Sequence, residues 1–113
     1  MNINKLIIET IESLDIDTFY IEASKGKDKY CIFSIYKENE EDIFDNLHSS
    51  IKYYITVNYW FRNPIDAELY KEIKKKMKLN KFKIDGCRDL PKTGNYYGKN
   101  IDFIYKQREE ITI

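Results

Sequence analysis

The stretch Ile51–Phe61 reads IKYYITVNYWF and alternates strictly between two kinds of side chain. Its odd-numbered positions hold Ile, Tyr, Val and Phe, whereas its even-numbered positions hold Lys, Tyr, Thr, Asn and Trp. Alternation with period two over this length predicts a long β-strand whose odd-numbered face packs on the core. Because Tyr54 and Trp60 lie on the even-numbered face, we expect part of that face to be covered as well.

A helix is predicted directly after this strand. Asn63 is a favourable N-cap, Pro64 suits the first helical position, and Asp66 belongs in the first turn. The helix runs to about Leu79 with Asn80 as its stop, and its outer face is basic. Its apolar positions recur every four residues, at Ile65, Leu69, Ile73 and Met77.

The residues before the long strand predict one helix and a hairpin. Apolar side chains recur at helical spacing over residues 2–14, at Ile3, Leu6, Ile7, Ile11 and Leu14. Two short strands follow, over residues 18–23 and 30–36, and the turn-forming run Lys25–Asp28 separates them. A turn between two strand-like runs is typical of a β-hairpin.

The last third of the chain predicts two further strands. Phe82 and Ile84 indicate a short strand, and a turn-rich loop with Gly86, Pro91, Gly94 and Gly98 follows it. The final strand places Ile101, Phe103 and Tyr105 on one face. The order α-β-β-β-α-(β)-β predicts an α+β fold, a two-layer sandwich of two helices on a mostly antiparallel sheet of four to five strands.

Length and composition restrict the class of protein. With 113 residues, 42% of them hydrophobic, the chain predicts a single globular domain over residues 1–113. Its 19 basic and 19 acidic residues cancel, which argues against non-specific nucleic-acid binding. No apolar run reaches the length of a signal peptide or membrane span, so we expect a cytoplasmic protein with no membrane partner. In that compartment Cys31 is expected to be a buried thiol and Cys87 a loop thiol.

The sequence offers no catalytic apparatus. His48 is the single histidine, and no Cys-x-x-Cys or His-x-x-x-His spacing accompanies it. The four glycines match neither a phosphate-binding loop nor a dinucleotide fingerprint. We therefore expect a protein that is not an enzyme and that has no catalytic residue, cofactor or metal ion.

The segment Glu38–Leu47, ENEEDIFDNL, carries five acidic residues and no basic one. It lies between two predicted strands and is interpreted as a long loop, because hairpin loops normally have 2–5 residues. Its apolar side chains, Ile43, Phe44 and Leu47, either fold back onto the core of their own domain or form an arm that contacts a neighbour. The residues predicted for this acidic contact are Glu38, Glu40, Glu41, Asp42, Phe44, Asp45 and Leu47.

Lysines dominate the surface of the second helix, and they continue to Lys81 and Lys83 beyond its end. The residues predicted for a contact there are Lys71, Lys74, Lys75 and Lys78. Three interpretations stay open. The lysines are an ordinary solvated face, they bind a nucleic acid or an acidic protein, or they meet the acidic segment of another copy in a head-to-tail association that closes into a ring.

The order of elements also resembles a known family. Over residues 3–106 the strand sequences KYCIFSIYKE, YYITVNYWFRN and GKNIDFIYK and the helix sequence AELYKEIKKKMKLNKF resemble the tail terminators, or tail-to-head joining proteins, of tailed bacteriophages and prophages. The run Val57–Trp60 followed by a capped helix is the most distinctive part.

The resemblance implies a structural role without catalytic or metal residues. Such proteins form hexameric rings at the head-proximal end of the tail tube, where they end tube polymerisation and join the tail to the head. The partners implied are further copies of the chain, the tail tube protein, and the connector or adaptor proteins of the head. The places implied are the cytoplasm of the bacterial host during assembly and then the tail–head junction of the virion.

Overall fold

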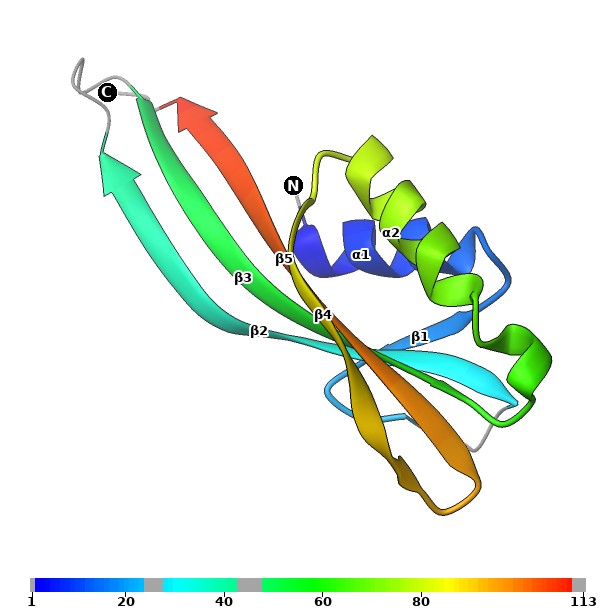
Figure 1. Cartoon of the computed structure of the whole chain (residues 1–113). Helices are drawn as coiled ribbons and strands as arrows, with labels where there is room; N and C mark the ends of the chain where they lie inside the picture. Colours follow the sequence, from blue (N-terminus) through cyan, green and yellow to red (C-terminus); the bar gives the residue numbers. More distant parts are fainter. Residues whose placement is uncertain (1, 24–27, 43–47, 111–113) are drawn as a thin grey trace.

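The computed structural model describes residues 2–23, 28–42 and 48–110, and it has the predicted α+β architecture. A five-stranded mixed sheet, in the strand order β1-β2-β3-β5-β4, carries two α-helices on one face (Figure 1). The elements are α1 (Ile3–Glu12), β1 (Asp17–Tyr20), β2 (Lys29–Asp42), β3 (His48–Phe61), the short 3-10 helix η1 (Pro64–Asp66), α2 (Leu69–Leu79), β4 (Lys83–Thr93) and β5 (Tyr96–Glu110).

The central strand β3 confirms the alternation that predicted it. It pairs antiparallel with β2 on one side and with β5 on the other. The odd-numbered side chains of Ile55, Val57 and Tyr59 are fully buried under the helices. Phe33 from β2 and Phe103 from β5 lie on the same face and are also buried. This inner face, the one that carries the helices, therefore holds the core.

Local capping explains where the two helices begin and end. The Asn2 side chain accepts a hydrogen bond from the Lys5 amide at the start of α1. The single helix predicted from Pro64 to about Leu79 is wrong in its first part: Asn63 caps only the 3-10 helix η1, and Ile65 is 81% exposed. α2 begins at Leu69, and its Ile73 and Met77 face the core as predicted. At the end of α2 the left-handed Lys81 (φ 72°) lets the Phe82 amide bond to the Met77 carbonyl at 3.0 Å, which closes the helix.

The predicted hairpin of the first two strands is wrong. β1 and β2 are parallel, with Asp17 opposite Tyr30 and Tyr20 opposite Phe33. After β1 the chain turns at Ile21, whose φ is 70°, and it returns to the starting end of the strand before β2 begins. Eight residues separate the two strands. A parallel connection usually takes a dozen or more, and the hairpin was predicted because the turn-forming run Lys25–Asp28 separates the two strand-like runs.

The predicted short strand and turn-rich loop after α2 are also replaced by a longer element. β4 is an eleven-residue strand that pairs antiparallel with β5. Gly86 and Pro91 lie at two irregularities of the register in this strand, and only the turn at Gly94 (φ 58°) reverses the chain. Because β4 is an edge strand, it tolerates a proline and bulges that would interrupt a central strand.

The sheet is longer than the helices that cover it. The molecule measures 53 × 23 × 22 Å along its principal axes, and β2, β3 and β5 continue past the helices as a curved three-stranded extension (Figure 1). We call this extension the arm and define it as residues 37–42, 48–54 and 104–110. The face of the sheet opposite the helices, the outer face, carries no helix in the described part of the chain.

Candidate subunit interface

The acidic segment forms one strand of the arm, and its interpretation as a long loop is wrong for residues 38–42. These residues continue β2, with Glu38 opposite Tyr53 and Asp42 opposite Ser49. Pairing with β3 supplies backbone hydrogen bonds that override the low strand propensity of glutamate. The predicted contact residues Phe44, Asp45 and Leu47 lie outside the described residues, as does the side chain of Asp42.

The register divides the acidic side chains between the two faces of the arm. Glu38 and Glu40 are opposite Tyr53 and Ile51, so they lie on the inner face, the same side as the helices. Glu41 is opposite the even-numbered Ser50 and lies on the outer face. The arm therefore does not present its predicted contact residues as one acidic patch.

Glu41 is already compensated within the chain. Its carboxylate lies 3.0 Å from the Lys106 ammonium on β5, and this hydrogen bond holds the pKa of Glu41 below its usual range. Glu38 and Glu40 form no ion pair with any described residue. The uncompensated acidic surface of the arm is therefore its inner face.

A hollow opens on that inner face, where the arm meets the start of α1. Its cavity volume is about 530 Å³. Glu38 lies on its wall, and the other residues that line it are Asn2, Ile3, Asn4, Tyr20, Ile35 and Tyr53. The hollow thus combines aliphatic and aromatic side chains with one carboxylate. Such a combination suits a partner that offers an apolar group beside a cation.

The net positive charge of the α2 surface is lower than its number of lysines suggests. Lys71 lies 2.7 Å from Glu68 and Lys75 lies 3.5 Å from Glu72 on the same helix. The hydrogen bond to Glu68 raises the pKa of Lys71. The ammonium of Lys74 lies 5.6 Å from the centre of the Tyr70 ring. These exposed ion pairs are weak and can exchange partners, but they reduce the positive field of the helix.

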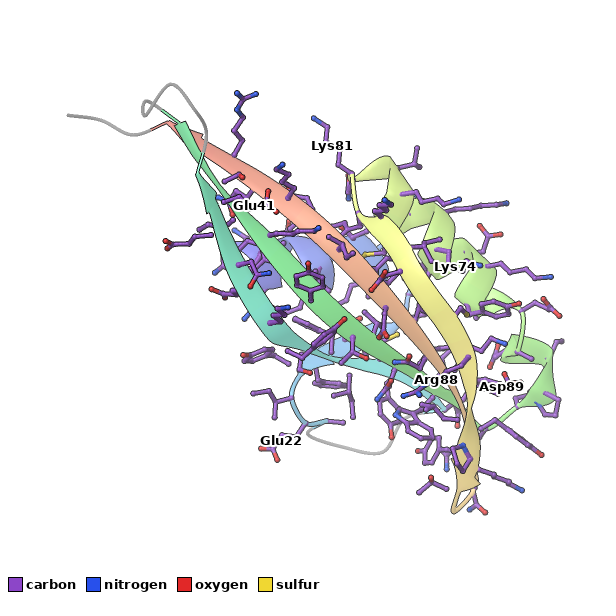
Figure 2. All side chains as sticks on the ribbon, turned by 60° about the vertical axis from the view of Figure 1, so that its left-hand side comes forward. Glu22, Glu41, Lys74, Lys81, Arg88 and Asp89 are labelled. Atoms are coloured by element: carbon purple, nitrogen blue, oxygen red, sulfur yellow. The ribbon has the colours of Figure 1, made fainter. Side chains whose placement is uncertain are left out.

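The acidic and basic surfaces do not meet within one chain. α2 packs next to β4, whereas the acidic strand β2 is separated from β4 by the two strands β3 and β5. Figure 2 shows Glu41 on the arm and Lys74 on α2 on opposite sides of the sheet. An association between the two surfaces would therefore require two copies of the chain.

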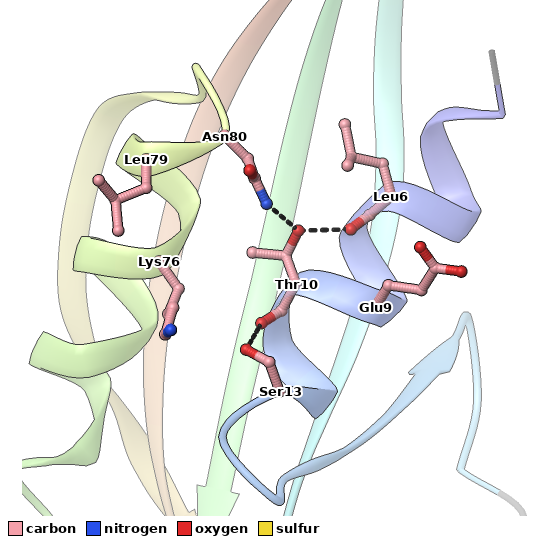
Figure 3. Close-up of a pocket in the computed structure, with 7 residues that line it drawn as sticks. All are labelled: Leu6, Glu9, Thr10, Ser13, Lys76, Leu79 and Asn80. Carbon is pink, nitrogen blue, oxygen red and sulfur yellow. Dashed lines mark hydrogen bonds between the residues drawn. The ribbon is translucent and has the colours of Figure 1, made fainter.

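Leu79 is the feature of this surface that the sequence prediction missed. It is the last residue of α2, directly after Lys78, and it is 77% exposed. It lies at the mouth of a groove of about 260 Å³ between the two helices, opposite Leu6 (Figure 3). In that groove the Asn80 amide donates a 2.7 Å hydrogen bond to the Thr10 hydroxyl, which fixes the end of α2 against α1.

The outer face is polar in its centre and aromatic at the end away from the arm. Tyr30 and Tyr96 approach each other to 5.4 Å between ring centres, and the Trp60 ring packs against Gly98. In the centre the buried Asn100 donates hydrogen bonds to Thr56 at 2.7 Å and to Asn58 at 2.8 Å. The expectation that another element covers Tyr54 and Trp60 is not met by any described part of the chain.

Two features are absent from the described residues. They contain no group of three or more His, Cys, Asp or Glu side chains placed to hold a metal ion. Neither helix within the described ranges has the length and apolar character needed to cross a membrane. Comparison of the chain with models of known protein families and with curated protein sequences gives no match.

Proposed function

We propose that this chain is a non-enzymatic structural subunit that assembles into a ring at the head-proximal end of a bacteriophage tail. In this role the ring ends polymerisation of the tail tube and joins the tail to the connector of the head. The subunit would assemble in the bacterial cytoplasm and remain at the tail–head junction of the virion. The proposal starts from the resemblance of residues 3–106 to tail terminators.

The observation that carries the proposal is the arm. Its inner face places two acidic side chains, Glu38 and Glu40, beyond the cover of the chain's own helices, and the basic surface lies apart from them on α2, which packs next to β4 at the other edge of the sheet. Every copy therefore has one surface of each sign, separated by the width of the sheet. Separated complementary surfaces generate head-to-tail contacts, and such contacts form a ring when the rotation closes.

The test is location and tail length in assembled particles. A tagged copy of the chain should be found at the tail–head junction by electron microscopy, and removal of its gene should give tails of uncontrolled length that carry no heads. A protein found elsewhere in the particle, or absent from it, would overturn the proposal.

A module that binds nucleic acid through Lys71–Lys83 is the competing function. The ion pairs of Lys71 with Glu68 and of Lys75 with Glu72 lower the net positive charge of this surface. The 19 basic residues of the chain are also balanced by 19 acidic ones, which disfavours non-specific nucleic-acid binding. Filter binding with single-stranded and double-stranded DNA at 50 and 200 mM salt separates the two functions. We expect no salt-sensitive retention; affinity that falls steeply with salt would favour the binding module.

A further inference from the structure

We infer that Leu79, together with Lys75 and Lys78, docks into the hollow on the inner face of the arm of a second copy of this chain. The inference rests on the proposed ring and names the contact that would build it. Leu79 would enter the apolar part of the hollow, and the two lysines would reach Glu38 and Glu40 at its rim.

The donor surface combines an exposed apolar side chain with cations on one side of α2. Lys75, Lys78 and Leu79 lie at spacings of three and four residues, so they share a patch one turn long. Leu79 is 77% exposed, and of the large hydrophobic side chains in the described part of the chain only Ile65, at 81%, is more exposed. Many protein interfaces have an apolar anchor at the centre and a polar or charged rim around it. An exposed leucine with lysines beside it has this arrangement.

The acceptor surface has the complementary composition. Ile3, Ile35 and Tyr53 form apolar walls, and Tyr20, which is 45% exposed, leaves one side open. Glu38 lines the hollow itself, and Glu40 lies two residues further along the same face of the strand. The two carboxylates thus lie beside a hollow whose walls are formed in part by Ile3, Ile35 and Tyr53.

The occupant is a second copy because the chain itself carries both halves of the contact, at two separate places along α1: Leu79 borders Leu6 and Thr10, whereas the hollow borders Ile3 and Asn4. Two acidic groups of one copy face two basic groups of the next, so the match of charge also sets the direction of assembly. Each copy uses its helix on one neighbour and its arm on the other. This contact is heterologous, and a ring is its closed form.

The experiment is disulfide trapping of the full chain. The exposed Cys87 is first replaced by Ser, while the buried Cys31 is kept. Glu38→Cys and Leu79→Cys are then combined in one chain and oxidised with copper–phenanthroline at about 100 μM. Because each copy carries both cysteines, a head-to-tail contact gives a ladder of dimers, trimers and larger covalent species, provided that the Cβ atoms approach to about 4 Å.

Three matched variants control the result. Glu38→Cys alone and Leu79→Cys alone are limited to dimers. Glu38→Cys with Ile65→Cys moves the second thiol to an equally exposed residue outside the proposed contact. We expect at least a tenfold weaker ladder from the Ile65 pair than from the Leu79 pair. A ladder of equal strength from both pairs, or no ladder from either, would overturn the proposed contact.

Charge reversal then tests the pairing of charges. Lys75→Glu with Lys78→Glu in the trapping background should reduce the ladder severalfold, and adding Glu40→Lys should restore part of it. The outcome is independent of the proposed function. A strong ladder from a protein that is absent from the tail–head junction would refute the function and keep the contact, whereas a protein at the junction that gives no ladder would do the reverse.

Discussion

The two halves of strand β3 follow the same alternation of side chains but differ in how deeply those side chains are buried. In its second half Ile55 and Val57 are fully buried, whereas in its first half Ile51 and Tyr53 on the same face are only half-buried. The reason is length. A strand of 14 residues spans about 46 Å at about 3.3 Å per residue, but a ten-residue helix spans only about 15 Å. Alternation sets which face turns inward, and helix length sets how much of that face is covered.

The sharpest test of this comparison substitutes the same residue in both halves. Ile55→Ala should lower the free energy of unfolding by about 2–5 kcal/mol, because it leaves a cavity in a core that cannot collapse around it. Ile51 lies on the same face of β3, four residues earlier and outside the cover of the helices. Ile51→Ala should lower the free energy of unfolding by less than about 1.5 kcal/mol. Urea denaturation followed by far-UV circular dichroism measures both values. Equal losses would show that the arm is packed as tightly as the body of the domain.

The outer face offers a second comparison, at the end away from the arm. A Cβ atom added at Gly98 would lie 2.5 Å from Cζ3 of Trp60 and 3.0 Å from Cβ of Leu90. Gly98→Ala should therefore destabilise the domain by about 1–3 kcal/mol through overpacking. It should also change the emission of Trp60, the single tryptophan of the chain.

The matched control removes the Trp60 ring that the added methyl group would meet. Trp60→Ala combined with Gly98→Ala should lose less stability than the sum of the two single substitutions, because the added methyl group then enters the space left by the indole. Strict additivity in this double-mutant cycle would contradict the contact between the ring and the glycine.

The sequence predicted the parts of the fold that depend on local periodicity. In β3, α1 and α2 the apolar residues recur with the period of a strand or of a helix. The buried face of each element could therefore be predicted from the local sequence. β4 was shortened in the prediction because Gly86 and Pro91 are typical turn residues. Their place in an edge strand depends on β5, which lies later in the sequence.

The candidate interface was predicted in its charges but not in its shape. Glu38, Glu40 and the lysines of α2 were identified from composition alone, and the structure places them on separate surfaces. The hollow could not be predicted, because its walls come from α1, β1, β2 and β3 at once. Leu79 was predicted only as the approximate end of α2. Its exposure depends on where the helix ends relative to α1, which no local pattern specifies.

The helix layer provides a smaller test of how the body differs from the arm. Asn80→Ala removes the 2.7 Å hydrogen bond to Thr10 and should lower the free energy of unfolding by about 0.5–1.5 kcal/mol. Asn39→Ala on the arm should change it by less than about 0.5 kcal/mol, as is usual for a surface substitution. Thermal or urea denaturation measures both values. A larger loss at Asn39 would indicate that the arm has polar contacts as important as those of the body.

The smallest expected effect is the titration of Glu41 on the arm. Its pKa in the folded chain is lowered by the hydrogen bond to Lys106, so this pair contributes its stabilisation above the carboxyl's unfolded pKa of about 4.3 and loses it as the pH falls through the folded value. Carboxyl NMR should show the midpoint of Glu41 moving upward in the variant Lys106→Gln. Because this ion pair lies at the surface, with the side chains of Glu41 and Lys106 39% and 61% exposed, stability itself should hardly change. An unchanged midpoint would mean that the arm does not hold Glu41 of β2 and Lys106 of β5 together across β3 in solution, and the inner-face hollow, which depends on the same position of β2, would lose its support.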